Sequence, residues 1–218
     1  MIIVGHRGAR GLAPENTLAS FEKAVEHHVD MLECDLRVTK DAKIVLHHDR
    51  NLRAPDGQKY AIKEYTHQDL NKLKPDLILL SDLLKAYPDS SYYLEIKPKV
   101  DTKPIIDHLT KHAPKHFKIG SKSQKILREI HKALPDVNLI VIQPWSGVIA
   151  SYRARQVGAK DVAFNKIWLW TGFIKAVSKS GYNVYAYTLN DPKKAKKWQK
   201  AGLYGVITDY PDLFDQNR

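Results

Sequence analysis

Short apolar runs alternate along the chain with longer stretches in which apolar residues recur every three or four positions. The first pattern is typical of buried strands, and the second of helices with one apolar face. We predict strands at residues 2–4, 31–38, 92–96, 117–119, 138–142, 162–164, 183–188 and 204–207. We predict helices at residues 17–28, 77–86, 104–112, 124–133, 148–156, 171–180 and 192–201. About eight alternating units predict an α/β fold, a closed (β/α)8 TIM barrel with its helices outside.

One part of the pattern departs from this alternation. An extra strand at residues 44–46 follows a predicted hairpin turn, and residues 49–76 are polar and predicted to be irregular, with a turn at 56–57. We also expect Asn16 to cap the first helix. The chain has no linker or low-complexity stretch, so residues 1–218 are predicted to form one barrel domain. Barrels of this kind typically need about 250 residues, so a chain of 218 residues lies near the lower end of their range.

Composition and charge narrow the class of protein. A single cysteine, Cys34, excludes an intrachain disulfide, and the first residues resemble a strand more than a signal peptide, so we expect a cytoplasmic protein. The formal net charge of +11 favours anionic partners such as phosphate esters or acidic lipid surfaces. A lysine-rich solvated surface explains the same charge more simply. No nucleic-acid-binding motif is recognisable, and we expect no such partner.

Polar residues gather where the predicted strands end, which is where active sites lie in such barrels. Residues two apart on a strand share a face, so Glu33 and Asp35 point the same way. Glu95 belongs to the next barrel strand, and three buried carboxylates without a cation would repel one another. All-carboxylate ligation suits a hard divalent ion, Mg²⁺ or Ca²⁺. Each motif alone has a structural interpretation: a solvent-exposed acidic pair, or an ion pair between Glu95 and Lys97.

Two histidines are candidates for proton transfer. His6 and His48 lie at predicted strand ends beside the carboxylates, and imidazole titrates near neutral pH. Arg7 has the planar guanidinium that binds two phosphate oxygens at once. A salt bridge from Arg7 to Glu15 is the alternative, and both contacts can exist together.

These residues belong to seven segments that resemble the glycerophosphodiester phosphodiesterase family over nearly the whole chain. The segments are 6–8 (HRG), 13–17 (APENT), 33–35 (ECD), 48–49 (HD), 94–97 (LEIK), 187–190 (YTLN) and 205–211 (GVITDYP). The resemblance implies a (β/α)8 barrel with His6 and His48 as catalytic acid and base. It also implies Glu33, Asp35 and Glu95 as metal ligands, and Arg7 and Lys97 as phosphate contacts.

The chain departs from the family pattern at three places. Tyr187 replaces a tryptophan that usually contacts substrate, and Lys122 replaces the phenylalanine that usually follows Ser121. The stretch 49–76 is shorter than the usual insertion, which predicts a more open cleft and weak selection of the alcohol group. These departures concern substrate preference and leave the expected reaction unchanged.

The expected reaction is metal-dependent hydrolysis of a glycerophosphodiester to glycerol 3-phosphate and an alcohol, as part of lipid metabolism. One histidine would deprotonate water or the neighbouring glycerol hydroxyl, and the other would protonate the leaving alcohol. A lysophospholipase D-type activity on lipid substrates is the alternative, with transient contact to anionic membranes and with Trp145, Trp168 and Trp170 touching acyl chains. A catalytically silent phosphodiester-binding barrel is a further alternative. The sequence leaves the oligomeric state open.

Overall fold

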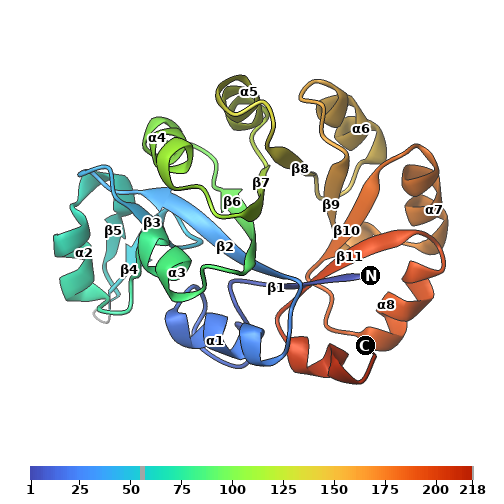
Figure 1. The fold of residues 1–218 in the computed structure, drawn as a ribbon, viewed down its shortest axis with the longest axis horizontal. Helices are drawn as coiled ribbons and strands as arrows, with labels where there is room; N and C mark the ends of the chain where they lie inside the picture. The colour runs from blue at the N-terminus through green and yellow to red at the C-terminus, as the bar shows by residue number, and fades with distance from the viewer. Residues whose placement is uncertain (55–56, 218) are drawn as a thin grey trace.

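The computed structural model describes residues 1–54 and 57–217, which form a closed barrel of parallel strands. β11 pairs with β1, and β1 pairs with β2, so the sheet closes on itself. Figure 1 shows these strands at the centre of a ring of helices. The strands in order are β1 (Ile2–Gly5), β2 (Met31–Val38), β6 (Ser91–Ile96), β7 (His116–Ser121), β8 (Asn138–Ile142), β9 (Asp161–Asn165), β10 (Asn183–Tyr187) and β11 (Leu203–Thr208). The predicted (β/α)8 fold is confirmed.

The helices of the ring begin where local capping chemistry starts them. Ser123 and Ser146 accept backbone N–H groups at the starts of α5 and α6, and α8 begins at Pro192 after the cap residue Asp191. Among the described residues no helix is long and apolar enough to cross a bilayer. The ring consists of α1 (Leu18–Glu26), α3 (Leu80–Ala86), α4 (Lys103–His112), α5 (Gln124–Ala133), α6 (Gly147–Arg155), α7 (Thr171–Lys179), α8 (Pro192–Gln199) and the 3₁₀ helix η3 (Pro211–Asn217).

Apolar side chains fill two separate layers of the barrel. The inner layer lies inside the ring of strands and includes Val4, Tyr93 and Tyr185. The outer layer lies between strands and helices. Cys34 points into the outer layer and is fully buried, as the strand periodicity predicts. Its neighbours Glu33 and Asp35 therefore point toward the barrel interior.

The stretch predicted to be irregular has its own structure. After β3 (Ile44–Leu46) come β4 (Asn51–Arg53), β5 (Lys59–Ala61), the 3₁₀ helix η1 (Ile62–Glu64) and α2 (His67–Leu73). The irregular prediction was wrong because a few scattered apolar residues meet in a small third cluster: Val45, Leu52, Ile62, Leu70 and Leu77. Position 56 of the predicted turn lies outside the described residues. We call residues 49–76 the insertion; Figure 1 shows its helix α2 beyond β3, outside the ring.

Two predicted helix starts need correction. Thr17 caps α1, because its hydroxyl accepts the N–H of Ser20 while the Ser20 hydroxyl accepts the N–H of Thr17. Asn16 has a left-handed backbone, with φ of 57°, and its side chain bonds Asp35. The second predicted helix begins at Leu80, three residues later than expected, because Leu79 is still extended and bridges to Val45.

Candidate functional site

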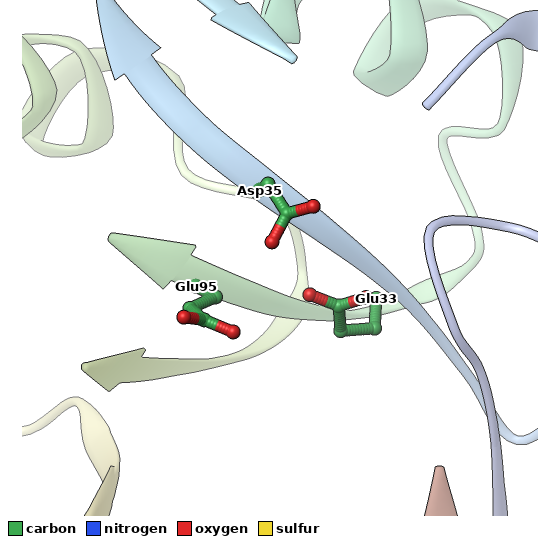
Figure 2. A group of neighbouring side chains, drawn as sticks. All are labelled: Glu33, Asp35 and Glu95. Atoms are coloured by element: carbon green, nitrogen blue, oxygen red, sulfur yellow. The ribbon is translucent and has the colours of Figure 1, made fainter. Parts of the chain in front are cut away.

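Three carboxylates converge inside the C-terminal end of the barrel. Asp35 on β2 lies in register with Glu95 on β6, and Glu33 lies two residues earlier on β2. Each contributes an oxygen to a group whose atoms all lie within 4.8 Å of one another. Figure 2 shows the three carboxylates turned toward one another from the two strands. Glu33 and Asp35 are buried, so the surrounding water screens their charges little.

One oxygen of each carboxylate lacks a hydrogen-bond donor. Glu33 Oε1, Asp35 Oδ1 and Glu95 Oε1 are buried and accept no hydrogen bond among the described residues. Lys97 Nζ lies 2.5 Å from Asp35 Oδ1 and 2.7 Å from Glu95 Oε1, without hydrogen-bond alignment. Three carboxylates that converge within 4.8 Å, with Lys97 beside two of them, form an oxygen-only donor set for a hard divalent cation. The residues present therefore fit such an ion.

The charges in this cluster shift one another's protonation. Burial, with the neighbouring Asp35 and Glu95, raises the pKa of Glu33 well above its usual value. Burial would also raise the pKa of Asp35, but Lys97 and Arg7 outweigh burial and lower it. Burial would lower the pKa of Lys97, yet the carboxylates around it raise it. At neutral pH the cluster therefore holds a cationic Lys97 beside an ionised Asp35.

Arg7 connects the first loop to the carboxylates. Its backbone is left-handed, with φ of 53°, and its N–H donates to Glu33 Oε2 at 2.8 Å. Its Nη1 donates to both oxygens of Glu15 at 2.8 Å. Its Nε lies 3.1 Å from Asp35 Oδ2, within ion-pair distance but misaligned for a hydrogen bond. The salt bridge to Glu15, considered as the alternative for Arg7, is thus present while Arg7 also faces the site.

His6 is held by residues from the other end of the chain. Its Nδ1 lies 2.6 Å from Asp209 Oδ1, just after β11. Asn190 donates to Asp209 Oδ2 and accepts the Asp209 N–H, while Arg10 Nε lies 2.8 Å from Asp209 Oδ1. Burial would raise the pKa of Asp209, but the bonds from His6 and Asn190 and the charge of Arg10 lower it. An ionised Asp209 fixes the His6 ring and leaves its Nε2 available to the cavity.

His48 is set less firmly. Its Nδ1 lies 2.7 Å from Asp49 Oδ1, and its carbonyl accepts two N–H groups of Arg37. Burial and the nearby Lys97 lower the pKa of His48. Asp49 is mostly exposed, in contrast to the partner of His6. The two histidines thus share a carboxylate partner but differ in how rigidly it is held.

All but one of the predicted site residues line a single cavity of about 220 Å³. The exception is Asp35, which lies behind it, bonded to Asn16. Ser121 does not reach this cavity, because its hydroxyl donates to the Ile96 carbonyl and accepts the Ser123 N–H. The predicted residues on the wall are His6, Arg7, Glu33, His48, Glu95, Lys97 and Tyr187, joined by Arg10, Tyr93, Lys122, Ile142, Asn165, Thr188 and Ile207.

Sequence reasoning missed three side chains that support this cavity. Asp209 and Asn190 lie in segments that resemble the family pattern, but no role followed from their spacing. Asn16 was given the wrong partner. Closure of the barrel was the available clue: β11 pairs with β1, so a carboxylate just after β11 must lie beside the end of β1. His6 stands at that end.

Comparison with known proteins identifies the family to which the chain belongs. Residues 6–213 match the model of the glycerophosphoryl diester phosphodiesterase family. This chain belongs to that family. It is therefore a phosphoric diester hydrolase, and hydrolysis of glycerophosphodiesters is the family's reaction.

Individual relatives cover almost all of the chain. The Bacillus subtilis protein YhdW is 30% identical, over 98% of this chain and 96% of its own length. Human lysophospholipase D GDPD1 is 24% identical, over 95% of this chain and 83% of its own length. An Oleispira antarctica phosphodiesterase, solved with its product sn-glycerol-3-phosphate, superposes with a TM-score of 0.88 at 22% identity. That structure is covered to 96%, and this chain to 100%.

Proposed function

We propose that this family member hydrolyses glycerophosphodiesters to glycerol 3-phosphate and an alcohol, with one divalent cation held by Glu33, Asp35 and Glu95. The convergence of these three carboxylates, each with an oxygen within 4.8 Å of the others inside the barrel, is the observation that carries the proposal. Their oxygen-only chemistry favours Mg²⁺ or Ca²⁺. When bound, the cation would supply Lewis-acid withdrawal of charge from the phosphate.

His6 and His48 perform the proton transfers in this proposal. Both face the same cavity, and each has its Nδ1 beside a carboxylate oxygen. That contact favours the tautomer or imidazolium in which the other ring nitrogen serves the substrate. One histidine removes the proton of the attacking hydroxyl or water, and the other protonates the leaving alcohol.

Cationic side chains balance the charge of the reacting phosphate. Lys97 and Arg7 line the cavity next to the carboxylates, where their charges stabilise the negative charge that grows on the phosphate oxygens. Tyr187 forms another part of the wall, and its hydroxyl stays protonated because burial and Glu95 raise its pKa. We assign Tyr187 to contact with the glycerol or alcohol portion.

A direct assay tests this function. The protein is treated with chelator, each divalent ion is restored separately, and release of glycerol 3-phosphate is measured from glycerophosphocholine and glycerophosphoethanolamine. We expect no activity after chelation and recovery with Mg²⁺ or Ca²⁺. Activity that survives complete chelation would rule out the proposed cation. Similar rates on both head groups would support an open cleft, and a strong preference would contradict it.

A lysophospholipase D-type activity is the second candidate. Trp145, Trp168 and Trp170 are each more than half exposed, which leaves part of each ring available to contact a lipid substrate. Human GDPD1, a relative over nearly the whole chain, carries that activity in its name. The same assay with lysophosphatidylcholine, compared with glycerophosphocholine, separates the two candidates.

A further inference from the structure

Large apolar side chains stand exposed on the two segments that follow β8 and β9, beside the cavity, including the first turn of α6 and the 3₁₀ helix η2 (Lys166–Trp168). We call six of them the aromatic rim: Trp145, Val148, Ile149, Ile167, Trp168 and Trp170. They are six of the fifteen exposed large hydrophobic residues in the described part of the chain, within a span of 26 positions (145–170). Val148 is 82% exposed and Ile167 is 75% exposed. Side chains this bare contribute nothing to the core, and gathered exposed apolar groups mark an interaction surface.

The segment after β8 and the segment after β9 lie side by side and form one surface. β8 and β9 are neighbours in the barrel, and Asn165 N–H donates to the Pro144 carbonyl at 3.1 Å between their ends. Trp170 packs on Phe173 of α7 with ring centroids 5.3 Å apart. A Cβ on Gly147, at the start of α6, would lie 3.3 Å from that same Phe173 ring. Figure 1 shows α6 and α7 side by side on this part of the ring.

The rim also borders the mouth of the proposed active site. Ile142 ends β8 just before Trp145, and Asn165 ends β9 just before Ile167. Both line the cavity, together with Lys122 from the next loop. A partner that binds to the rim would therefore have its own chemical groups at the entrance of the cavity.

The charged residues within the two segments of the rim are of one sign. Residues 142–160 and 162–182 contain no aspartate or glutamate, whereas Lys166, Lys175 and Arg153 lie within them. Asp161 is buried at the opposite end of the barrel, paired with Lys118. Lys122, which is exposed at the cavity mouth, adds to the positive side. Against a second copy of this chain the same positive face would repel itself, whereas an anionic bilayer complements it.

We propose that the aromatic rim and its flanking cations dock this enzyme on anionic phospholipid bilayers. Tryptophan prefers the boundary between headgroups and acyl chains, and apolar contact adds to electrostatic attraction there. Docking orients the cavity toward headgroups. Membrane docking does not depend on the proposed function. Its consequence, that lipid-borne phosphodiesters reach the site from the bilayer, rests on the proposed function.

Vesicle binding tests the surface without using activity. The full-length protein is sedimented with vesicles of phosphatidylcholine alone and of phosphatidylcholine mixed with phosphatidylglycerol. We expect binding to the mixed vesicles that weakens with added salt. The double variant I167S/W168S should bind at least about tenfold more weakly. The matched control V25S/Y204S removes one aliphatic and one aromatic residue that are each 39% exposed at the other end of the barrel, and it should bind like wild type.

A measurement on the wild type covers the case in which the double variant folds poorly. Three of the four tryptophans belong to the rim, and the fourth, Trp198, is buried. Brominated lipids should therefore quench most of the exposed tryptophan emission when vesicles bind. Absence of wild-type binding, equal loss in V25S/Y204S, or unquenched emission on bound vesicles would overturn the proposal. A wild-type dimer that I167S/W168S dissociates would overturn it too, in favour of a second copy as the partner.

Hydrolysis of water-soluble glycerophosphocholine separates this inference from the proposed function. Neither Ile167 nor Trp168 lines the cavity, so I167S/W168S should keep wild-type rates on that substrate. If the wild type has no diesterase activity, the proposed function fails and the vesicle result still decides the docking surface. If I167S/W168S loses activity on glycerophosphocholine as well, the rim acts on the site itself and the docking proposal is wrong.

Discussion

At the N-terminal end of the barrel, buried charge is matched by partners. Lys118 Nζ lies 2.5 Å from Asp161 Oδ2 and 3.2 Å from the Tyr185 hydroxyl, and Asn183 donates to the other oxygen of Asp161 at 2.7 Å. At the C-terminal end, three carboxylates share the ammonium of Lys97 and the guanidinium of Arg7, and Glu33 Oε1 has no donor among the described residues. A cluster whose buried charges all have partners stabilises the fold, whereas a cluster with an excess of one charge can bind a ligand of the opposite charge. Mutations at the C-terminal end should therefore change the reaction rate, and mutations at the N-terminal end should change the free energy of unfolding.

The largest effect expected from this comparison is on the reaction rate. H6A and H48A each remove a proton-transfer group from the C-terminal end and should lower kcat by about 10²–10⁴. The melting temperature should stay close to that of wild type, because neither ring belongs to an apolar layer. Steady-state kinetics and thermal unfolding of the same samples check this. Full diesterase activity in both variants would contradict the assigned roles.

The opposite response is expected at the N-terminal end. K118M leaves Asp161 buried with Asn183 as its remaining side-chain partner among the described residues. We expect a loss of about 2–3 kcal/mol in the free energy of unfolding, less than for a fully buried pair because a fifth of the Lys118 side chain is exposed. Activity at low temperature should be unchanged. Urea denaturation measures the loss, and a change in kcat without a change in stability would break the comparison.

A smaller effect on the reaction rate is expected for Asp209, which holds His6 in place. D209N keeps the size of Asp209 but removes the charge that orients His6. Asp209 acts through His6, so we expect about a 10–100-fold fall in kcat with KM nearly unchanged. N190D is unsuitable as a control, since a second carboxylate would repel Asp209. D49N is the matched variant beside His48, and it tests whether loss of an exposed carboxylate lowers kcat less than loss of Asp209.

The smallest predicted effect is a gain in stability. The raised pKa of Glu33 means that its ionised form destabilises the fold above its unfolded pKa of about 4.3. Without cation, E33Q should be about 1–2 kcal/mol more stable than wild type at pH 7. The difference should shrink as the pH falls toward about 4, where Glu33 is protonated in both states. Mg²⁺ or Ca²⁺ should raise the melting temperature of wild type more than that of E33Q.

Most of the barrel follows from local pattern, and the exceptions have a common cause. The barrel strands were predictable because a run such as Leu139–Ile142 must be buried on both faces. The structure of the insertion was missed because its three core residues, Leu52, Ile62 and Leu70, are too far apart in the sequence to form a periodic pattern. Thr17 and Asn16 are both good capping residues, and only the contact of Asn16 with Asp35, 19 positions away, separates them.

The candidate site divides in the same way. Strand periodicity predicts that Glu33 and Asp35 share a face, and the barrel brings Glu95 beside them. The bond between His6 and Asp209 spans 203 positions and appears only when the last strand meets the first. The chemical roles of these residues stay predictions until the variants above are measured. Local pattern thus finds ligands that one strand presents together, and it misses partners that only closure of the barrel creates.

The apolar cluster of the insertion is separate from both layers of the barrel, but it is shared with Val45 of β3 and with Leu77. The insertion is therefore anchored on β3 and on the residues just before α3, and its described apolar residues take no part in the two layers of the barrel. A unit of this kind can be exchanged, lengthened or trimmed while the inherited catalytic frame keeps its shape. A change in its length would then alter the surface beside β3, because none of the described residues that line the cavity belongs to the insertion.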